Sequence, residues 1–170
     1  MNKKWVIAGL ITLILIVGGG IWYYEAYMKN VLPSTAQAPA TAASSTISYV
    51  NNNYGFTFSL PASWRGYTIA TSTWTGYSTP LEHGPIISIR NPLWTSSTPT
   101  QDIPIMVFTP TEWSVVSTGN MTVSAAPFPP SELGENNQYV FALPARYNYA
   151  FPQGWQEVQS IIQGNPLRAF

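Results

Sequence analysis

The residues able to do acid–base, nucleophilic or metal chemistry are few in this chain. His83 is the only histidine and there is no cysteine, which excludes disulfides, thiolate metal sites and a cysteine nucleophile. A Ser–His–Asp triad would have to use His83, and no Gly-x-Ser-x-Gly motif is present. A histidine-based metal site would need carboxylates such as Glu82 or Asp102, which show no ligand spacing. We therefore expect residues 82–85 to form a polar turn before a strand, and we predict no cofactor, metal site or catalytic residue.

Paired carboxylates are the remaining route to catalysis, as in glycoside hydrolysis. We expect Glu112 to cap a helix and Glu157 to lie on the exposed face of the last helix. The sequence gives no reason to choose a pair among the acids that follow residue 31, which are Glu82, Asp102, Glu112, Glu132, Glu135 and Glu157. A cell-envelope hydrolase that uses carboxylates is therefore an alternative to a protein without catalytic activity.

Residues suited to binding are better represented. Arg146 lies among tyrosines in the sequence LPARYNY, where a guanidinium could bind a carboxylate, stack on a ring or hold a loop through backbone carbonyls. Exposed flat rings can stack on sugars, and the best placed for this are Trp94, in the loop 92–99, and Tyr77, in a Gly-Tyr-Ser-Thr-Pro turn. The tryptophans expected in the core are Trp64, Trp113 and Trp155. A carbohydrate-binding module is thus a second alternative.

Composition places these residues in a folded, weakly charged domain. Only 8% of residues are charged, yet the chain has seven Trp, ten Tyr and seven Phe, enough aromatic surface to form a core. All three lysines precede residue 31, and four arginines face six acids beyond it. Binding to a phosphate backbone needs several cationic contacts, so we predict that the protein does not bind nucleic acid.

The segment Trp5–Tyr24 contains twenty residues without a charge, which is long enough for a helix to cross the ~30 Å hydrocarbon core. Aromatic rings lie at both ends of the segment, as is typical of the headgroup zones. Lys3 and Lys4 precede it, so we expect a single-pass cell-membrane protein with a cytoplasmic N-terminus and an extracytoplasmic C-terminal domain. A cleaved signal peptide is the alternative.

The rest of the chain divides at a change in composition. After the cytoplasmic tip and anchor (1–30), residues 31–46 are nearly all Ala, Ser, Thr and Pro beyond Leu32, which is typical of a spacer that does not fold by itself. The globular domain is predicted at 47–170.

The pattern of this domain predicts an α+β fold with an antiparallel sheet and one or two helices. Strands are expected at residues 54–60, 67–74, 85–90, 103–109, 121–124 and 139–143. Thr109-Pro110-Thr111-Glu112 matches a capping box with proline at the first helical position, which predicts a short helix ending before Gly119. A second helix is expected over residues 152–163, stopped by Gly164-Asn165-Pro166. Glu132 to Glu135 is expected to be a polar loop.

One stretch resembles a known family. The pattern Tyr54-Gly55-Phe56-x-Phe58-x-Leu60-Pro61-x-x-Trp64, within residues 49–64, is similar to the opening of PsbP-like domains. The resemblance implies an antiparallel sheet covered by helices, in secreted or membrane-attached proteins that act in assembly or binding. Other stretches resemble uncharacterised membrane-anchored envelope proteins of candidate-phylum bacteria, and these are Asn91-Pro92-Leu93-Trp94, residues 131–134 and residues 150–152.

Together these observations favour a membrane-tethered extracytoplasmic binding or assembly domain without catalytic activity. Its partners would be the membrane, through Trp5–Tyr24, and an envelope protein or glycan. The residues proposed for binding are Arg146, Trp94 and Tyr77.

Overall fold

The computed structural model describes residues 46–77, 82–123, 126 and 128–170. The predicted anchor and nearly all of the predicted spacer lie outside these residues. Among the residues described, no helix is long and apolar enough to span a bilayer. The features below all belong to the compact unit Ser44–Phe170.

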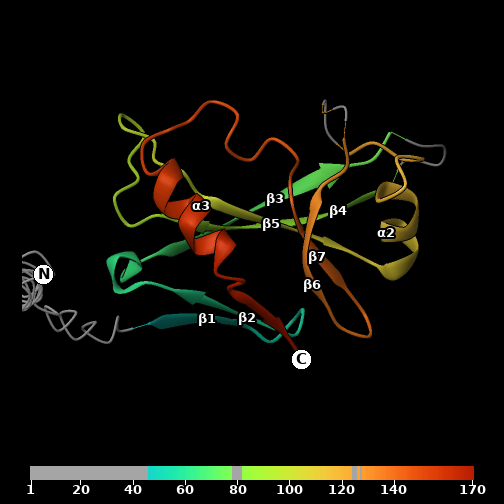
Figure 1. Cartoon of the computed structure of the whole chain (residues 1–170), viewed down its shortest axis with the longest axis horizontal. Helices are drawn as coiled ribbons and strands as arrows, with labels where there is room; N and C mark the ends of the chain where they lie inside the picture. The colour runs from blue at the N-terminus through green and yellow to red at the C-terminus, as the bar shows by residue number, and fades with distance from the viewer. Residues whose placement is uncertain (1–45, 78–81, 124–125, 127) are drawn as a thin grey trace, which may run out of the picture. The chain divides into compact units, whose positions relative to one another are not determined.

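The domain is α+β, as predicted, but it contains two antiparallel sheets rather than one (Figure 1). The three-stranded sheet has the order β1-β2-β8 and the five-stranded sheet has the order β3-β4-β5-β7-β6. The strands are β1 (Ile47–Asn51), β2 (Phe56–Leu60), β3 (Thr68–Thr75), β4 (His83–Arg90), β5 (Ile103–Phe108), β6 (Ser131–Glu135), β7 (Val140–Leu143) and β8 (Leu167–Ala169). The helices are the 3-10 turn η1 (Ala62–Trp64), α2 (Pro110–Val116) and α3 (Trp155–Gln163).

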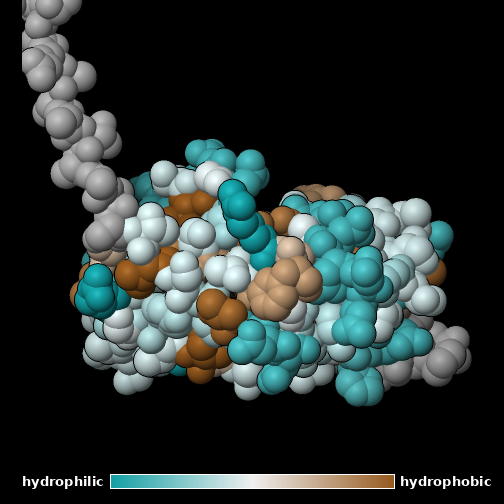
Figure 2. Space-filling model, turned by 90° about the horizontal axis from the view of Figure 1, so that it is seen from below, coloured by the Kyte–Doolittle hydropathy of each residue, from teal (hydrophilic) through white to brown (hydrophobic). Residues whose placement is uncertain are grey.

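The five-stranded sheet has a core on each face. Alternate residues of a strand point to opposite faces, so β5 sends Ile105 to one core and Met106 to the other. The first core joins β4 and β5 to β2 and α3, and its members include Phe56, Phe58, Trp64, Ile87, Ile89, Phe141 and Val158. The second core lies on the α2 side, and its members include Trp74, Phe108, Val116, Met121 and Val140. On the face shown in Figure 2, hydrophobic residues form small separate groups among hydrophilic and intermediate ones.

Local sequence signals explain β2 and α2. In β2 the side chains of Phe56, Phe58 and Leu60 are buried and the intervening ones are half-buried, which is the alternation that one buried face requires. In α2 the predicted capping box forms: the Glu112 amide donates to Thr109 Oγ1 at 3.3 Å, and the Thr109 amide donates to Glu112 Oε2 at 2.6 Å. These two bonds satisfy amides that would otherwise lack a partner at the helix start.

Two expectations were wrong, and two strands were not anticipated. Met121–Val123, the described part of a predicted strand, is irregular, because Met121 donates its amide to the Val115 carbonyl and Thr122 accepts from Tyr77. Residues 132–135, predicted as a polar loop, belong to β6, which pairs with β7 through a bulge. β1 and β8 flank β2 on its two sides and were not expected from the sequence.

Candidate functional site

The structure brings two of the three predicted binding residues to one end of the five-stranded sheet. Trp94 follows β4 and Arg146 follows β7, and these strands run in the same direction because both pair antiparallel with β5 between them. Tyr77 follows β3, which is antiparallel to β4. Tyr77 is 72% exposed but lies at the opposite end of the sheet, so it does not join Trp94 and Arg146 in one site.

Residues 144–153, between β7 and α3, form the most exposed aromatic feature of this end, and we call them the aromatic–arginine loop. Tyr149 is 70% exposed and Phe151 is 61% exposed. With Phe128, which is 55% exposed and precedes β6, these rings line a shallow pocket of about 440 Å³. The remaining lining residues are Ala145, Arg146 and Asn148. Large exposed rings grouped beside a cation are informative on a protein surface, so this loop is the candidate site.

Arg146 is exposed and lies against one of these rings. Its guanidinium carbon is 5.1 Å from the centroid of the Tyr149 ring, within the range of a cation–π contact. This contact orients the guanidinium beside the pocket while its N–H groups stay accessible. Arg146 can therefore bind a carboxylate next to an apolar group, because a guanidinium offers several donors in a planar fork.

The backbone of the loop is held in a conformation that a free peptide would avoid. Phe151 has φ +45°, a left-handed value that is uncommon for a bulky residue. Its amide donates to the Asn148 carbonyl at 3.0 Å, and its ring packs on Trp155 with centroids 5.0 Å apart. Strained backbone of this kind persists only where surrounding contacts fix it, and it is concentrated at functional sites.

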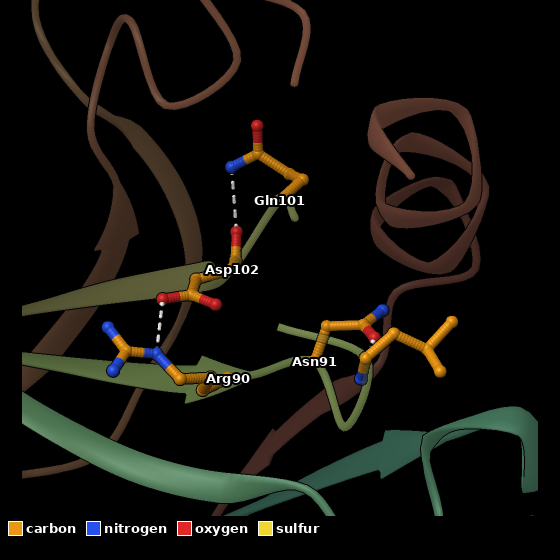
Figure 3. A network of polar contacts seen from close by, with 5 residues as sticks. Arg90, Asn91, Gln101 and Asp102 are labelled. Atoms are coloured by element: carbon orange, nitrogen blue, oxygen red, sulfur yellow. Dashed lines mark hydrogen bonds and ion pairs between the residues drawn. The ribbon is translucent and has the colours of Figure 1, made fainter. Parts of the chain in front are cut away.

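Further contacts that hold the loop come from Gln101, a residue that the sequence did not single out. Gln101 is 5% exposed and precedes β5. Its side-chain Nε2 donates to the Tyr147 carbonyl at 2.9 Å, and its backbone amide donates to the Gln153 carbonyl at 2.8 Å. A second bond from Nε2 reaches the Asp102 carbonyl at 2.8 Å (Figure 3). Gln101 therefore ties both halves of the aromatic–arginine loop to the sheet.

The same polar network extends to Trp94. Arg90 Nε lies 3.1 Å from Asp102 Oδ2, and the Arg90 guanidinium lies 4.0 Å from the centroid of the Trp94 ring. Figure 3 shows Arg90 and Asp102 facing each other from β4 and from the start of β5. Trp94 is half-buried and Arg90 covers one of its faces, so Trp94 supports the network rather than offering that face to a sugar.

Three buried oxygens of this network have no hydrogen-bond partner among the residues that the structure describes, and these are Thr100 Oγ1, Gln101 Oε1 and Asp102 Oδ1. They do not converge on one ligand, since Figure 3 shows the free oxygens of Gln101 and Asp102 pointing in different directions. Within the described residues no three histidine or carboxylate groups are close enough to hold a metal ion. The bonds that Gln101 makes to the carbonyls of Tyr147 and Gln153 connect this network to the loop and support its position.

Apart from Asp102, the residues considered for catalysis lie outside this network. His83 is exposed and begins β4, and Glu132 and Glu135 lie on the edge strand β6. Three of the acids have protein partners: Asp102 pairs with Arg90, Glu112 caps α2, and Glu157 accepts from Ser63 Oγ at 2.6 Å. Glu157 is half-buried, not exposed as predicted.

The predicted core tryptophans differ in burial. Trp64 is fully buried, as predicted, whereas Trp113 and Trp155 are half-buried. Trp113 packs on Phe108 with ring centroids 5.5 Å apart. Trp155 instead supports the aromatic–arginine loop through Phe151.

No protein-family model, curated protein or solved structure matches the chain. The resemblance of residues 49–64 to PsbP-like domains therefore stays a prediction.

Proposed function

We propose that this chain is a membrane-tethered, extracytoplasmic binding or assembly domain without catalytic activity, and that its partner is an envelope protein docking on the aromatic–arginine loop. The observation that carries the proposal is the grouping of Tyr149, Phe151 and Phe128 around Arg146 on a loop held by the buried Gln101. The tether and its orientation rest on the uncharged segment 5–24 and the lysines before it.

The chemistry of the pocket defines the partner. Aromatic residues and arginine are the types enriched at the energetic centres of protein interfaces. The apolar rings favour an apolar side chain, and the exposed Arg146 favours a carboxylate beside it. The partner is therefore an envelope protein that presents a large apolar residue next to an acidic one.

A fixed loop also lowers the entropy that binding would otherwise cost. Ordering a rotamer-rich side chain at an interface costs roughly 0.5–1.5 kcal/mol. Here the guanidinium is already stacked on Tyr149 and the backbone is already held by Gln101. A preorganised surface of this kind binds more tightly than a mobile loop of the same composition.

The test is a pull-down from detergent-solubilised native membranes with the full-length tagged protein, followed by affinity measurement with the purified partner. We expect Arg146→Ala and Tyr149→Ala each to weaken binding at least about tenfold, equivalent to roughly 1.4 kcal/mol. Arg65→Ala is the matched control, since Arg65 is also an exposed arginine but lies outside the loop. Capture that is lost with Arg146→Ala and kept with Arg65→Ala supports the proposal.

Two results would overturn it. One is a partner that binds both loop variants as tightly as the unchanged chain. The other is the absence of a protein partner together with retardation of the unchanged chain on glycan or cell-wall matrices, which would favour carbohydrate binding instead.

A further inference from the structure

β3 (Thr68–Thr75) is an outer strand of the five-stranded sheet. It pairs with β4 along all eight residues, from Thr68 opposite Arg90 to Thr75 opposite His83, without a shift in register. Among the described residues, no strand pairs with its other side. The outer backbone groups of β3 therefore form a regular edge, which ends at Thr75 because the Tyr77 amide donates to the Thr122 carbonyl at 2.9 Å.

The register identifies which residues face outward. The Gly76 amide donates to the Glu82 carbonyl at 2.8 Å, in line with the β3–β4 ladder. Hydrogen-bonded and non-hydrogen-bonded pairs alternate along an antiparallel ladder. The backbone groups of residues 74, 72, 70 and 68 therefore bond to β4. The residues between them turn their N–H and C=O groups outward, and these are Ile69, Thr71, Thr73 and Thr75. Thr73 lies opposite Pro85. This is consistent with the assignment, because a non-hydrogen-bonded pair does not require the N–H that proline lacks.

β3 lacks the usual protection of an edge strand. Natural edges carry lysine, proline, an inward-pointing charge or a bulge, which prevent pairing with another chain. The sequence TIATSTWT contains no charge and no proline, and its ladder contains no bulge. All four outward residues are exposed. All four are also β-branched, which favours an extended backbone.

We propose that β3 pairs with β3 of a second copy of this chain, antiparallel about a two-fold axis at Ser72. This register places Ile69 opposite Thr75 and Thr71 opposite Thr73 of the other copy, so outward residues meet only outward residues. The four pairs form up to about eight backbone hydrogen bonds, since each hydrogen-bonded pair exchanges two. The two sheets become one continuous sheet of ten strands.

A second copy fits this edge better than a charged segment would. β3 carries no charge, so its symmetric pairing places no like charges opposite each other, which would be destabilising. Threonines facing each other across strands also form favourable pairs. A two-fold contact of this kind uses the same patch on both copies and therefore closes at a dimer.

Cysteine cross-linking of the full-length chain in membranes tests the proposal, because the unchanged chain has no cysteine. At the axis, Ser72 faces Ser72 in a non-hydrogen-bonded pair with Cα atoms about 4.5 Å apart, within the range that a disulfide spans. Ser72→Cys should form a disulfide dimer under mild oxidation. Thr75→Cys, on the same strand but opposite Ile69, is the matched control and should stay largely monomeric.

A second variant separates edge pairing from folding. Thr73→Pro in the Ser72→Cys background removes one outward N–H but no bond to β4, and proline is tolerated where the N–H faces away from the sheet. We expect loss of the cross-link with an unchanged far-ultraviolet circular dichroism spectrum. Three results would overturn the proposal: a Ser72→Cys chain that stays monomeric although maleimide labels it, equal cross-linking of Thr75→Cys, or a Ser72→Cys adduct with a different protein.

Discussion

The two edges of the five-stranded sheet are built differently. β6 carries Glu132 and Glu135, is interrupted by a bulge between Glu132 and Gly134, and lies against β8. β3 is longer, neutral and regular, and its outer side is unpaired among the described residues. One sheet thus combines an edge with two of the usual protective devices and an edge with none.

The fold therefore protects one edge of this sheet and leaves the other unprotected. An unprotected edge strand exposes a protein to unwanted association. Because β3 stays unprotected while β6 is protected, we infer that β3 serves to pair with another strand. The same division separates the two interaction surfaces proposed above, with β3 for a second copy and the loop after β7 for an envelope partner.

The largest predicted effect comes from detaching β3 from the sheet. Trp74 is 2% exposed, its Nε1 donates to the Val107 carbonyl of β5 at 2.9 Å, and its ring lies on Gly84 of β4. Trp74→Ala should lower the free energy of unfolding by about 3–5 kcal/mol and abolish Ser72→Cys cross-linking. Urea denaturation measures the first effect. The control Trp94→Ala should cost clearly less, and equal costs would show that Trp74 does not anchor the edge.

An intermediate effect is expected at the protected edge. Gly134 has φ +155°, and an added Cβ would lie 3.2 Å from Leu167 Cδ2 of β8. Gly134→Ala should therefore cost about 1–3 kcal/mol, through backbone strain and crowding. Gly119→Ala is the control, since Gly119 also has positive φ but has open space around it. Equal melting temperatures for the two variants would show that β6 is not held against β8 at this bulge.

The smallest effect concerns the loop after β7. Burial raises the pKa of Tyr147 above 10.0, so the folded state favours the neutral phenol. This contribution to stability is complete below about pH 10, the unfolded value, and is lost as pH rises through the folded pKa. Above that pH, the melting temperature of Tyr147→Phe should fall less steeply with rising pH than that of the unchanged chain. Below that pH, the two melting temperatures should depend on pH in the same way. Thermal melts across pH 8–11.5 provide the measurement, and parallel curves would exclude this role for Tyr147.

Local signals predicted the elements that depend on local contacts. The capping box of Thr109 and Glu112 and the alternation in β2 are readable because each is fixed within a few residues. β6 was missed because SELGE has a weak strand propensity and is held extended by pairing with β7. Met121 and Val123 are apolar and buried but serve as packing for α2, so their composition wrongly indicated a strand.

The candidate site was predictable only in part. Arg146 was identified because an arginine among tyrosines is rare in a chain with so few charges. Gln101 left only a weak signal, since a buried amide that bonds to a distant carbonyl has no local motif. That signal is its position as an uncharged polar residue just before the apolar run 103–108. Tyr77 and Trp94 could not be separated without the register of β3 and β4.

The three-stranded sheet determines how the domain would bear a mechanical load. β1 and β8 flank β2, with Ile47 opposite Leu60 at one end and Ala169 opposite Phe56 at the other. A force pulling Ile47 away from Phe170 would run along the strands and strain all their hydrogen bonds together, because those bonds lie across the strands. A force directed across the strands would break these hydrogen bonds one after another. A force directed along the strands has to break them together. The domain is therefore expected to resist unfolding by a force applied between Ile47 and Phe170.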